Sequence, residues 1–135
     1  MTLDAHNFTL YDVREFPIVT ANNDALVPGF AARWERELDA LVNQPRPFAL
    51  IFPEGRPEQE SREDRQRRMD WFKANKAKLA SVCLALISIE PDARKQESLR
   101  KRALTLAPFF GVPLDTASTP QDARTKAEAR LAGRC

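Results

Sequence analysis

The sequence predicts a single α/β domain over residues 1–135, with about four helices packed on a central, mainly parallel sheet of four to five strands. Residues 48–52 and 82–89 are short apolar runs without alternating polar positions, which is typical of strands covered on both faces. The charged segment between them is long enough to cross the sheet and return, so the two strands should be parallel. We expect residues 1–7 and 133–135 to be flexible ends.

The N-terminal third predicts two short strands and a helix. Residues 8–13 and 16–20 are rich in aromatic and β-branched side chains, and we expect them to pair at a sheet edge. Pro17 lacks a ladder N–H, which suits such an edge. A helix should run from about Pro28 to Asn43, because apolar residues recur on one helical face: Phe30, Trp34, Leu38 and Leu41.

The charged crossover is predicted to be a helix from about Glu60 to Leu79. Ser61 is a suitable N-cap, and the acidic residues after it complement the positive end of the helix dipole. The row expected to face the sheet is narrow and includes long basic side chains: Arg65, Met69, Phe72, Lys76 and Leu79.

Trp71 lies about 100° around this helix from Phe72. We therefore expect it to be exposed, on the same side as Arg67 and Lys78. Tryptophan and arginine are favoured anchors at protein interfaces, so this surface is a candidate protein contact. The alternative is that Trp71 only covers the edge of the core.

The C-terminal third predicts a helix, an edge strand and a final helix. Residues 90–92 begin the first of these helices and Gly111 ends it. Its apolar row should face the sheet: Leu99, Ala103, Leu106 and Phe110. Residues 112–117 contain a proline and should form a strand at the sheet edge. Thr119 should cap a last helix that continues through Leu131.

This order of elements over residues 8–132 resembles the STAS group, the sulfate-transporter and anti-sigma-factor-antagonist domains. The resemblance is one of element order and length, without a shared motif. In phosphorylated members a serine follows an aspartate at the start of the helix after a core strand. Ser61 has a comparable position, but Glu60 precedes it and a proline-bearing loop intervenes. The resemblance implies a small non-enzymatic module that acts by contacting another protein.

Composition excludes several classes of protein. The net charge of +2 does not require a polyanionic partner. The N-terminus lacks the pattern of a signal peptide, and no apolar run approaches the roughly 20 residues that span a bilayer. We therefore expect a cytoplasmic protein that does not bind membranes. Cys83 lies in an apolar strand and Cys135 is terminal, so no disulfide is expected. His6 is the only histidine, so we expect neither a catalytic triad nor a metal site.

Three functions remain open, and the first is a non-enzymatic protein-binding or regulatory module without a cofactor. Its contacts would be Arg67, Trp71 and Lys78, together with the loop over residues 53–57, and Ser61 is a further candidate. Homodimerisation through the first or the last strand is a variant of this hypothesis.

The second function is a small-molecule site or an enzyme at the carboxyl end of the first core strand. Glu54 would be its base, and Arg56 would lie beside it. The third is RNA binding through the basic helices. We do not expect nucleic acid, because acidic residues among the arginines favour pairing within each helix.

Overall fold

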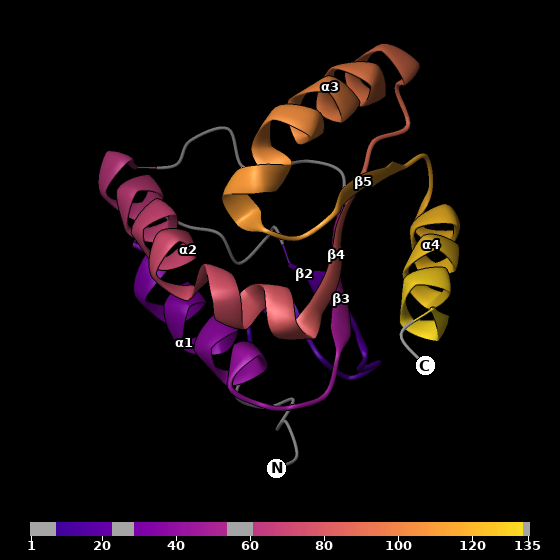
Figure 1. The fold of residues 1–135 in the computed structure, drawn as a ribbon. Helices are drawn as coiled ribbons and strands as arrows, with labels where there is room; N and C mark the ends of the chain where they lie inside the picture. The colour runs from indigo at the N-terminus through magenta and orange to yellow at the C-terminus, as the bar shows by residue number, and fades with distance from the viewer. Residues whose placement is uncertain (1–7, 23–28, 54–60, 134–135) are drawn as a thin grey trace.

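The computed structural model describes residues 8–22, 29–53 and 61–133, and it confirms the α/β class. The expected flexible ends at residues 1–7 and 134–135 lie outside the described residues. The elements, shown in Figure 1, are β1 (Tyr11–Asp12), β2 (Ile18–Ala21), α1 (Ala31–Val42), β3 (Phe48–Phe52), α2 (Arg62–Val82), β4 (Cys83–Ile89), α3 (Ala93–Phe110), β5 (Leu114–Ala117) and α4 (Pro120–Ala132).

The strands form one sheet in the order β1-β2-β3-β4-β5. β1 is antiparallel to β2, and every other neighbouring pair is parallel. The parallel pairing of the two core strands is therefore confirmed, as are the edge positions of the first and last strands. Each parallel strand is added on the same side of the one before it. Right-handed crossovers consequently place α1, α2 and α3 on one face of the sheet.

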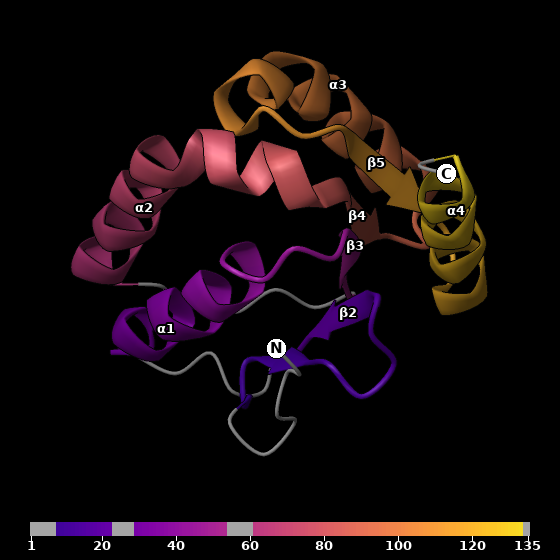
Figure 2. The same ribbon diagram turned by 60° about the horizontal axis from the view of Figure 1, so that its bottom comes forward.

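α4 covers the opposite face, as Figures 1 and 2 show. It packs through alanines: Ala123 and Ala127 are fully buried against small residues of the strands, among them Ala49, Ala85 and Ala117. The core under α1 and α2 is built from larger side chains. It holds the whole predicted row of the first helix, together with Phe48, Leu79 and Tyr11.

Most helix ends lie where the sequence predicts them. Ser61 and Thr119 cap α2 and α4 through hydrogen bonds from backbone N–H groups three residues later, and Asn43 is the C-cap of α1. Gly111 ends α3 in the left-handed conformation, with φ of 72°. The first helix begins later than predicted: Gly29 and Phe30 form a turn, with φ of 90° at Gly29, and α1 begins at Ala31. Pro28 itself lies outside the described residues.

Several strand and helix boundaries differ from the predictions, and so does the burial of α3. β1 comprises only Tyr11–Asp12 of the expected residues 8–13, and β2 and β5 each begin two residues later than expected. α2 continues to Val82. α3 buries none of its residues, and Leu106 of its predicted sheet-facing row is 37% exposed. The physical reason is position: α3 lies over the edge strand β5 and beside α2, so little of the sheet lies beneath it (Figure 1).

Candidate functional site

Trp71 is buried between α1 and α2, so the expectation that it is exposed is wrong. Its side chain is only 6% exposed. The indole Nε1 donates a hydrogen bond of 2.8 Å to Asp39 Oδ1 on α1. The ring meets those of Trp34 and Phe72 edge to face, with centroids 5.4 and 5.6 Å away. Trp71 therefore joins the two helices and is not available to a partner.

The predicted face of α2 is right only in part: Leu79 is buried and Phe72 packs against the core, as expected. The buried residues are Asp64, Trp71, Leu79 and Val82, whereas Arg65 and Lys76 of the predicted row are exposed. The true row was hard to recognise because it contains an aspartate. Non-helical φ and ψ at Asn75 also shift the inward face partway along the helix. The sequence did contain one sign of the true face: Asp64 and Trp71 are seven residues apart, which places them on the same side of a helix.

Arg67 and Lys78 are both exposed, and of the two only Arg67 forms an ion pair with another described residue. Arg67 Nε lies 2.8 Å from Glu35 Oε1, so this arginine bridges α2 to α1. The hydrogen bond to Glu35 raises the pKa of the Arg67 guanidinium. The three side chains predicted to form one surface, Arg67, Trp71 and Lys78, therefore have three different environments.

Ser61 has a structural role at the start of α2. Its Oγ accepts the Asp64 N–H at 3.0 Å and donates to Asp64 Oδ2 at 2.9 Å. The same carboxylate accepts the N–H groups of Gly29 and Ala31 at 2.8 and 3.3 Å, and so caps α1 as well. The Gly29 hydrogen bond, with that of Ser61, lowers the pKa of Asp64 below its usual value. This buried carboxylate fixes the start of two helices.

The predicted ligand site at the carboxyl end of β3 involves Glu54 and Arg56, which lie outside the described residues, as does most of the loop 53–57. The topology bears on it nevertheless. Open α/β sheets bind ligands in the crevice where the strand order reverses. The order β2-β3-β4-β5 runs in one direction, so the parallel strands contain no such reversal.

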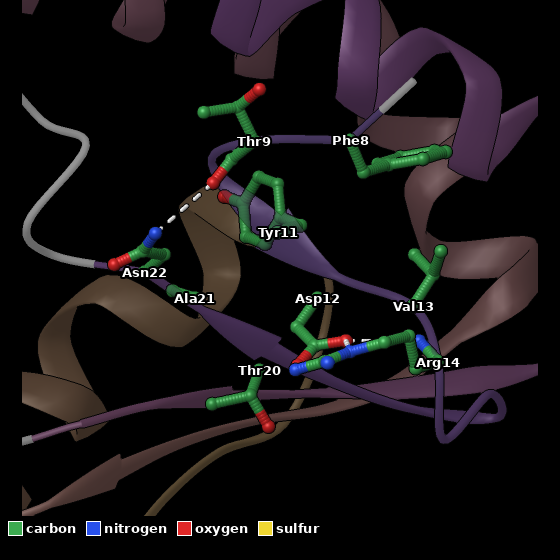
Figure 3. A pocket seen from close by; sticks show the side chains of 9 residues that line it. All are labelled: Phe8, Thr9, Tyr11, Asp12, Val13, Arg14, Thr20, Ala21 and Asn22. Carbon is green, nitrogen blue, oxygen red and sulfur yellow. Dashed lines mark hydrogen bonds and ion pairs between the residues drawn. The ribbon is translucent and has the colours of Figure 1, made fainter. Parts of the chain in front are cut away.

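A hollow of about 580 Å³ lies along β1 and β2, lined by side chains from both strands and their flanks (Figure 3). Several of its polar groups bond one another. Arg14 makes two hydrogen bonds to Asp12, at 3.0 and 2.7 Å, and Asn22 donates to the Thr9 carbonyl oxygen at 3.3 Å. Within the described interior, every buried polar side-chain atom has a hydrogen-bond partner. No buried group is therefore left to hold a ligand here.

Cys83 is a packing residue. It is 2% exposed, and burial raises the pKa of its thiol to about 12. A thiol needs an exposed, electropositive setting to act as a nucleophile. Among residues 8–22, 29–53 and 61–133 no three His, Cys, Asp or Glu side chains are grouped so that they could hold a metal ion. His6 lies outside these ranges. In the same ranges no helix is both long and apolar enough to span a bilayer.

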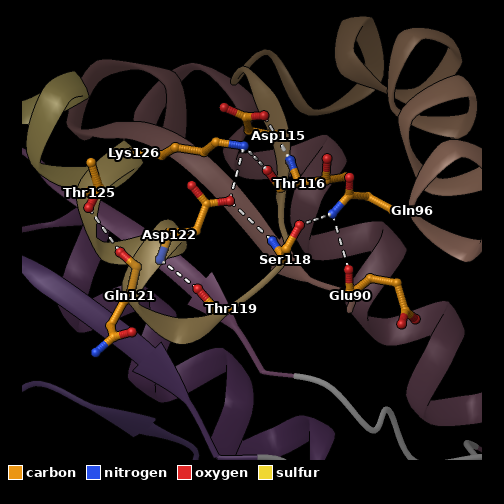
Figure 4. Close-up of polar contacts among 10 residues, drawn as sticks. All are labelled: Glu90, Gln96, Asp115, Thr116, Ser118, Thr119, Gln121, Asp122, Thr125 and Lys126. Atoms are coloured by element: carbon orange, nitrogen blue, oxygen red, sulfur yellow. Dashed lines mark hydrogen bonds and ion pairs between the residues drawn. The ribbon is translucent and has the colours of Figure 1, made fainter. Parts of the chain in front are cut away.

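The chain's own side chains bind the outward edge of β5. The carbonyl oxygens of Pro113 and Ala117 accept hydrogen bonds from the N–H groups of Leu86 and Glu90, so the alternate residue Thr116 presents its backbone away from the sheet. Its N–H donates to Asp115 Oδ1 at 2.8 Å, and its carbonyl oxygen accepts from Lys126 Nζ of α4. Figure 4 shows these contacts beside the cap of α4. An incoming strand would have to break them.

The opposite edge is bound in a similar way by a buried glutamate. Glu37 of α1 is 3% exposed and accepts the N–H groups of Thr9, Leu10 and Tyr11 at 2.9 to 3.1 Å. Because Leu10 bonds Asn22 beside β2, the next N–H, that of Tyr11, points away from the sheet. Both edges therefore resist strand addition, which disfavours a homodimer formed through either one.

The predicted inward row of α3 is an incompletely covered apolar surface. We call it the α3 row and define it as Leu99, Ala103, Leu106 and Phe110. Only its C-terminal end meets α2, where the Phe110 and Phe72 rings lie edge to face at 4.7 Å. Leu106 is exposed, and Leu99 and Ala103 are half-buried.

Comparison of the chain with protein-family models, with curated proteins and with solved structures finds no match. The arguments for function therefore come from the geometry.

Proposed function

We propose that the chain is a non-enzymatic protein-binding or regulatory module, and that the α3 row is its contact surface. The observation that carries the proposal is that no residue of this 18-residue helix is fully buried, and that Leu106 of its apolar row is 37% exposed. Burial of apolar surface is the main stabilisation of a surface helix, and a partner that covers Leu99 and Leu106 would supply it. The element order shared with the STAS group supports a role in contacting another protein.

RNA binding is less well supported than protein binding. Single-stranded nucleic acid is held largely by stacking on exposed aromatic rings. The indoles of Trp34 and Trp71 are 4% and 6% exposed, and both donate to internal oxygens, of Tyr11 and Asp39. Neither tryptophan is therefore available to stack on a base. We also propose a cytoplasmic location, which the free buried thiol of Cys83 supports because such thiols persist in reducing compartments.

The experiment compares proteins that co-purify with tagged wild type and with Leu106→Asp at native expression levels. A partner that depends on the α3 row is retained by wild type and lost by Leu106→Asp. The matched control is Leu104→Asp, because Leu104 is the more exposed leucine of the same helix, at 79%, and lies on its other side. If the two variants retain the same proteins as wild type, the α3 row is not the contact surface.

A further inference from the structure

We infer that the α3 row binds an acidic amphipathic helix of another protein. The inference rests on the proposed function and specifies the chemistry of the partner. It follows from the spacing of the row, the charges beside it and the state of the sheet edges.

The spacing of the two leucines in the α3 row suits a helical partner. Leu99 and Leu106 are seven residues apart, which is about two helical turns or roughly 10 Å along α3. This is the repeat with which helices pack against each other along their length. A strand could instead be added only at a sheet edge, and both edges are bound by Glu37 and by Lys126 with Asp115. Helix docking is therefore the mode that this face supports.

The charges beside the row specify an acidic partner. Lys95 and Arg102 are also seven residues apart and lie within about 60° of Leu99 and Leu106 on the helix. Both are exposed, and neither forms an ion pair within the part of the chain that the structure describes. The single acidic residue of α3, Glu97, pairs with Arg100 at 3.3 Å. A partner with Asp or Glu flanking its apolar face would complement both free cations.

A second copy of this chain fits the same face poorly. Symmetric packing of one α3 row on another would bring the Lys95 and Arg102 side chains of the two copies close together. Like charges brought together at an interface oppose association. The occupant is therefore a different protein.

The test uses two synthetic helical peptides with the same leucine-rich face, one flanked by glutamates and the other by lysines. Binding to the full chain is measured by fluorescence anisotropy at low and at physiological salt. We expect the glutamate peptide to bind and the lysine peptide not to bind. Leu106→Ser should weaken the affinity by roughly tenfold or more, as loss of a buried leucine contact would. The double variant K95E/R102E should prefer the lysine peptide.

Matched controls lie on the opposite side of α3. Leu104 is about 160° from Leu106, and Lys101 is about 100° from Arg102. Leu104→Ser and Lys101→Glu should leave the affinity within about twofold of wild type, since surface changes away from a contact have small effects. Circular dichroism and thermal melts of every variant show whether the fold is retained.

Several outcomes would overturn the inference. These are equal affinity for both peptides, equal loss in Leu104→Ser and Leu106→Ser, or no binding of the glutamate peptide. Preferential binding of phosphatidylserine vesicles or of a single-stranded RNA oligonucleotide, each tested in parallel, would also overturn it. A partner that depends on Leu106 in co-purification but carries no acidic helix would leave the proposed function standing and reject only the inferred chemistry.

Discussion

Carboxylates of α1 and α2 hold other elements of the chain in place. Asp64 caps α1 from α2, Glu37 holds the backbone before and in β1, and Asp39 accepts the indole N–H of Trp71. In a sequence such residues resemble solvated surface charges, because their partners lie more than 25 residues away along the chain. This distance is why candidate acidic residues in the sequence could not be sorted into structural and functional ones.

Replacement of Trp71 by alanine should destabilise the fold. The substitution removes a buried ring from contacts with Trp34 and Phe72 and leaves Asp39 without its donor. Truncation of a buried tryptophan costs about 3–5 kcal/mol in the free energy of unfolding, measured here by urea denaturation. Lys78→Ala on the exposed side of α2 should change it by less than about 0.5 kcal/mol. Equal stability of the two variants would contradict the burial of Trp71.

The Asp64 carboxylate should make stability depend on pH. The pKa of Asp64 is lowered in the folded protein. At pH values near the folded and unfolded pKa the unfolded chain therefore binds more protons, and the free energy of unfolding falls as pH falls. The contribution is complete above the unfolded pKa, about 3.9, and is lost through the lower folded pKa. Asp64→Asn should therefore cost about 1–3 kcal/mol at neutral pH and progressively less in acid.

Urea titrations of wild type and Asp64→Asn across this pH range measure the effect. The exposed Glu63 of the same helical turn provides the control, as Glu63→Gln. A difference between wild type and Asp64→Asn that stays constant down to the acid limit would show that the charge of Asp64 is not what holds the two helices.

At the scale of elements, glycine has a conformational role at the end of α3. Gly111 has φ of 72°, and a Cβ there would lie 3.1 Å from Lys76 Cε, at the flexible end of that side chain. The main cost of Gly111→Ala is thus the left-handed backbone, about 1–2 kcal/mol in the free energy of unfolding. Gly133 ends α4 with φ of −67°, so Gly133→Ala should be neutral or slightly stabilising. Thermal melts should show a clearly lower melting temperature for Gly111→Ala and an unchanged or slightly higher one for Gly133→Ala.

The elements themselves were largely predictable from sequence. Ser61, Gly111 and Thr119 act locally, through bonds or backbone angles set within a few residues, and each lies where its chemistry requires. The inward face of α2 was not predictable, because it depends on Asp64 reaching Gly29. The incomplete burial of α3 depends on what lies beneath it, which no local pattern records.

At the scale of the whole molecule, the two bound edges should keep the sheet from pairing with other sheets. Lys126→Met preserves the apolar stem and removes the ammonium that binds the Thr116 carbonyl oxygen. We expect this variant to self-associate with increasing concentration in sedimentation velocity, because it frees an edge acceptor.

Arg130→Met, an exposed change on the same helix, should sediment as wild type does. Identical sedimentation of Lys126→Met and wild type would show that Lys126 is not needed to protect β5.

The candidate site could be predicted from sequence only in part. The apolar row of α3 was recognised, but how far the row is covered depends on the edge position of β5.

The contact between Trp34 and Trp71 also supplies a spectroscopic signal. These are the two tryptophans of the chain, with ring centroids 5.4 Å apart and planes at 78°. Indoles at this separation couple electronically and give a paired band in the circular dichroism spectrum. Loss of that band during unfolding would report when α1 separates from α2, without an added label.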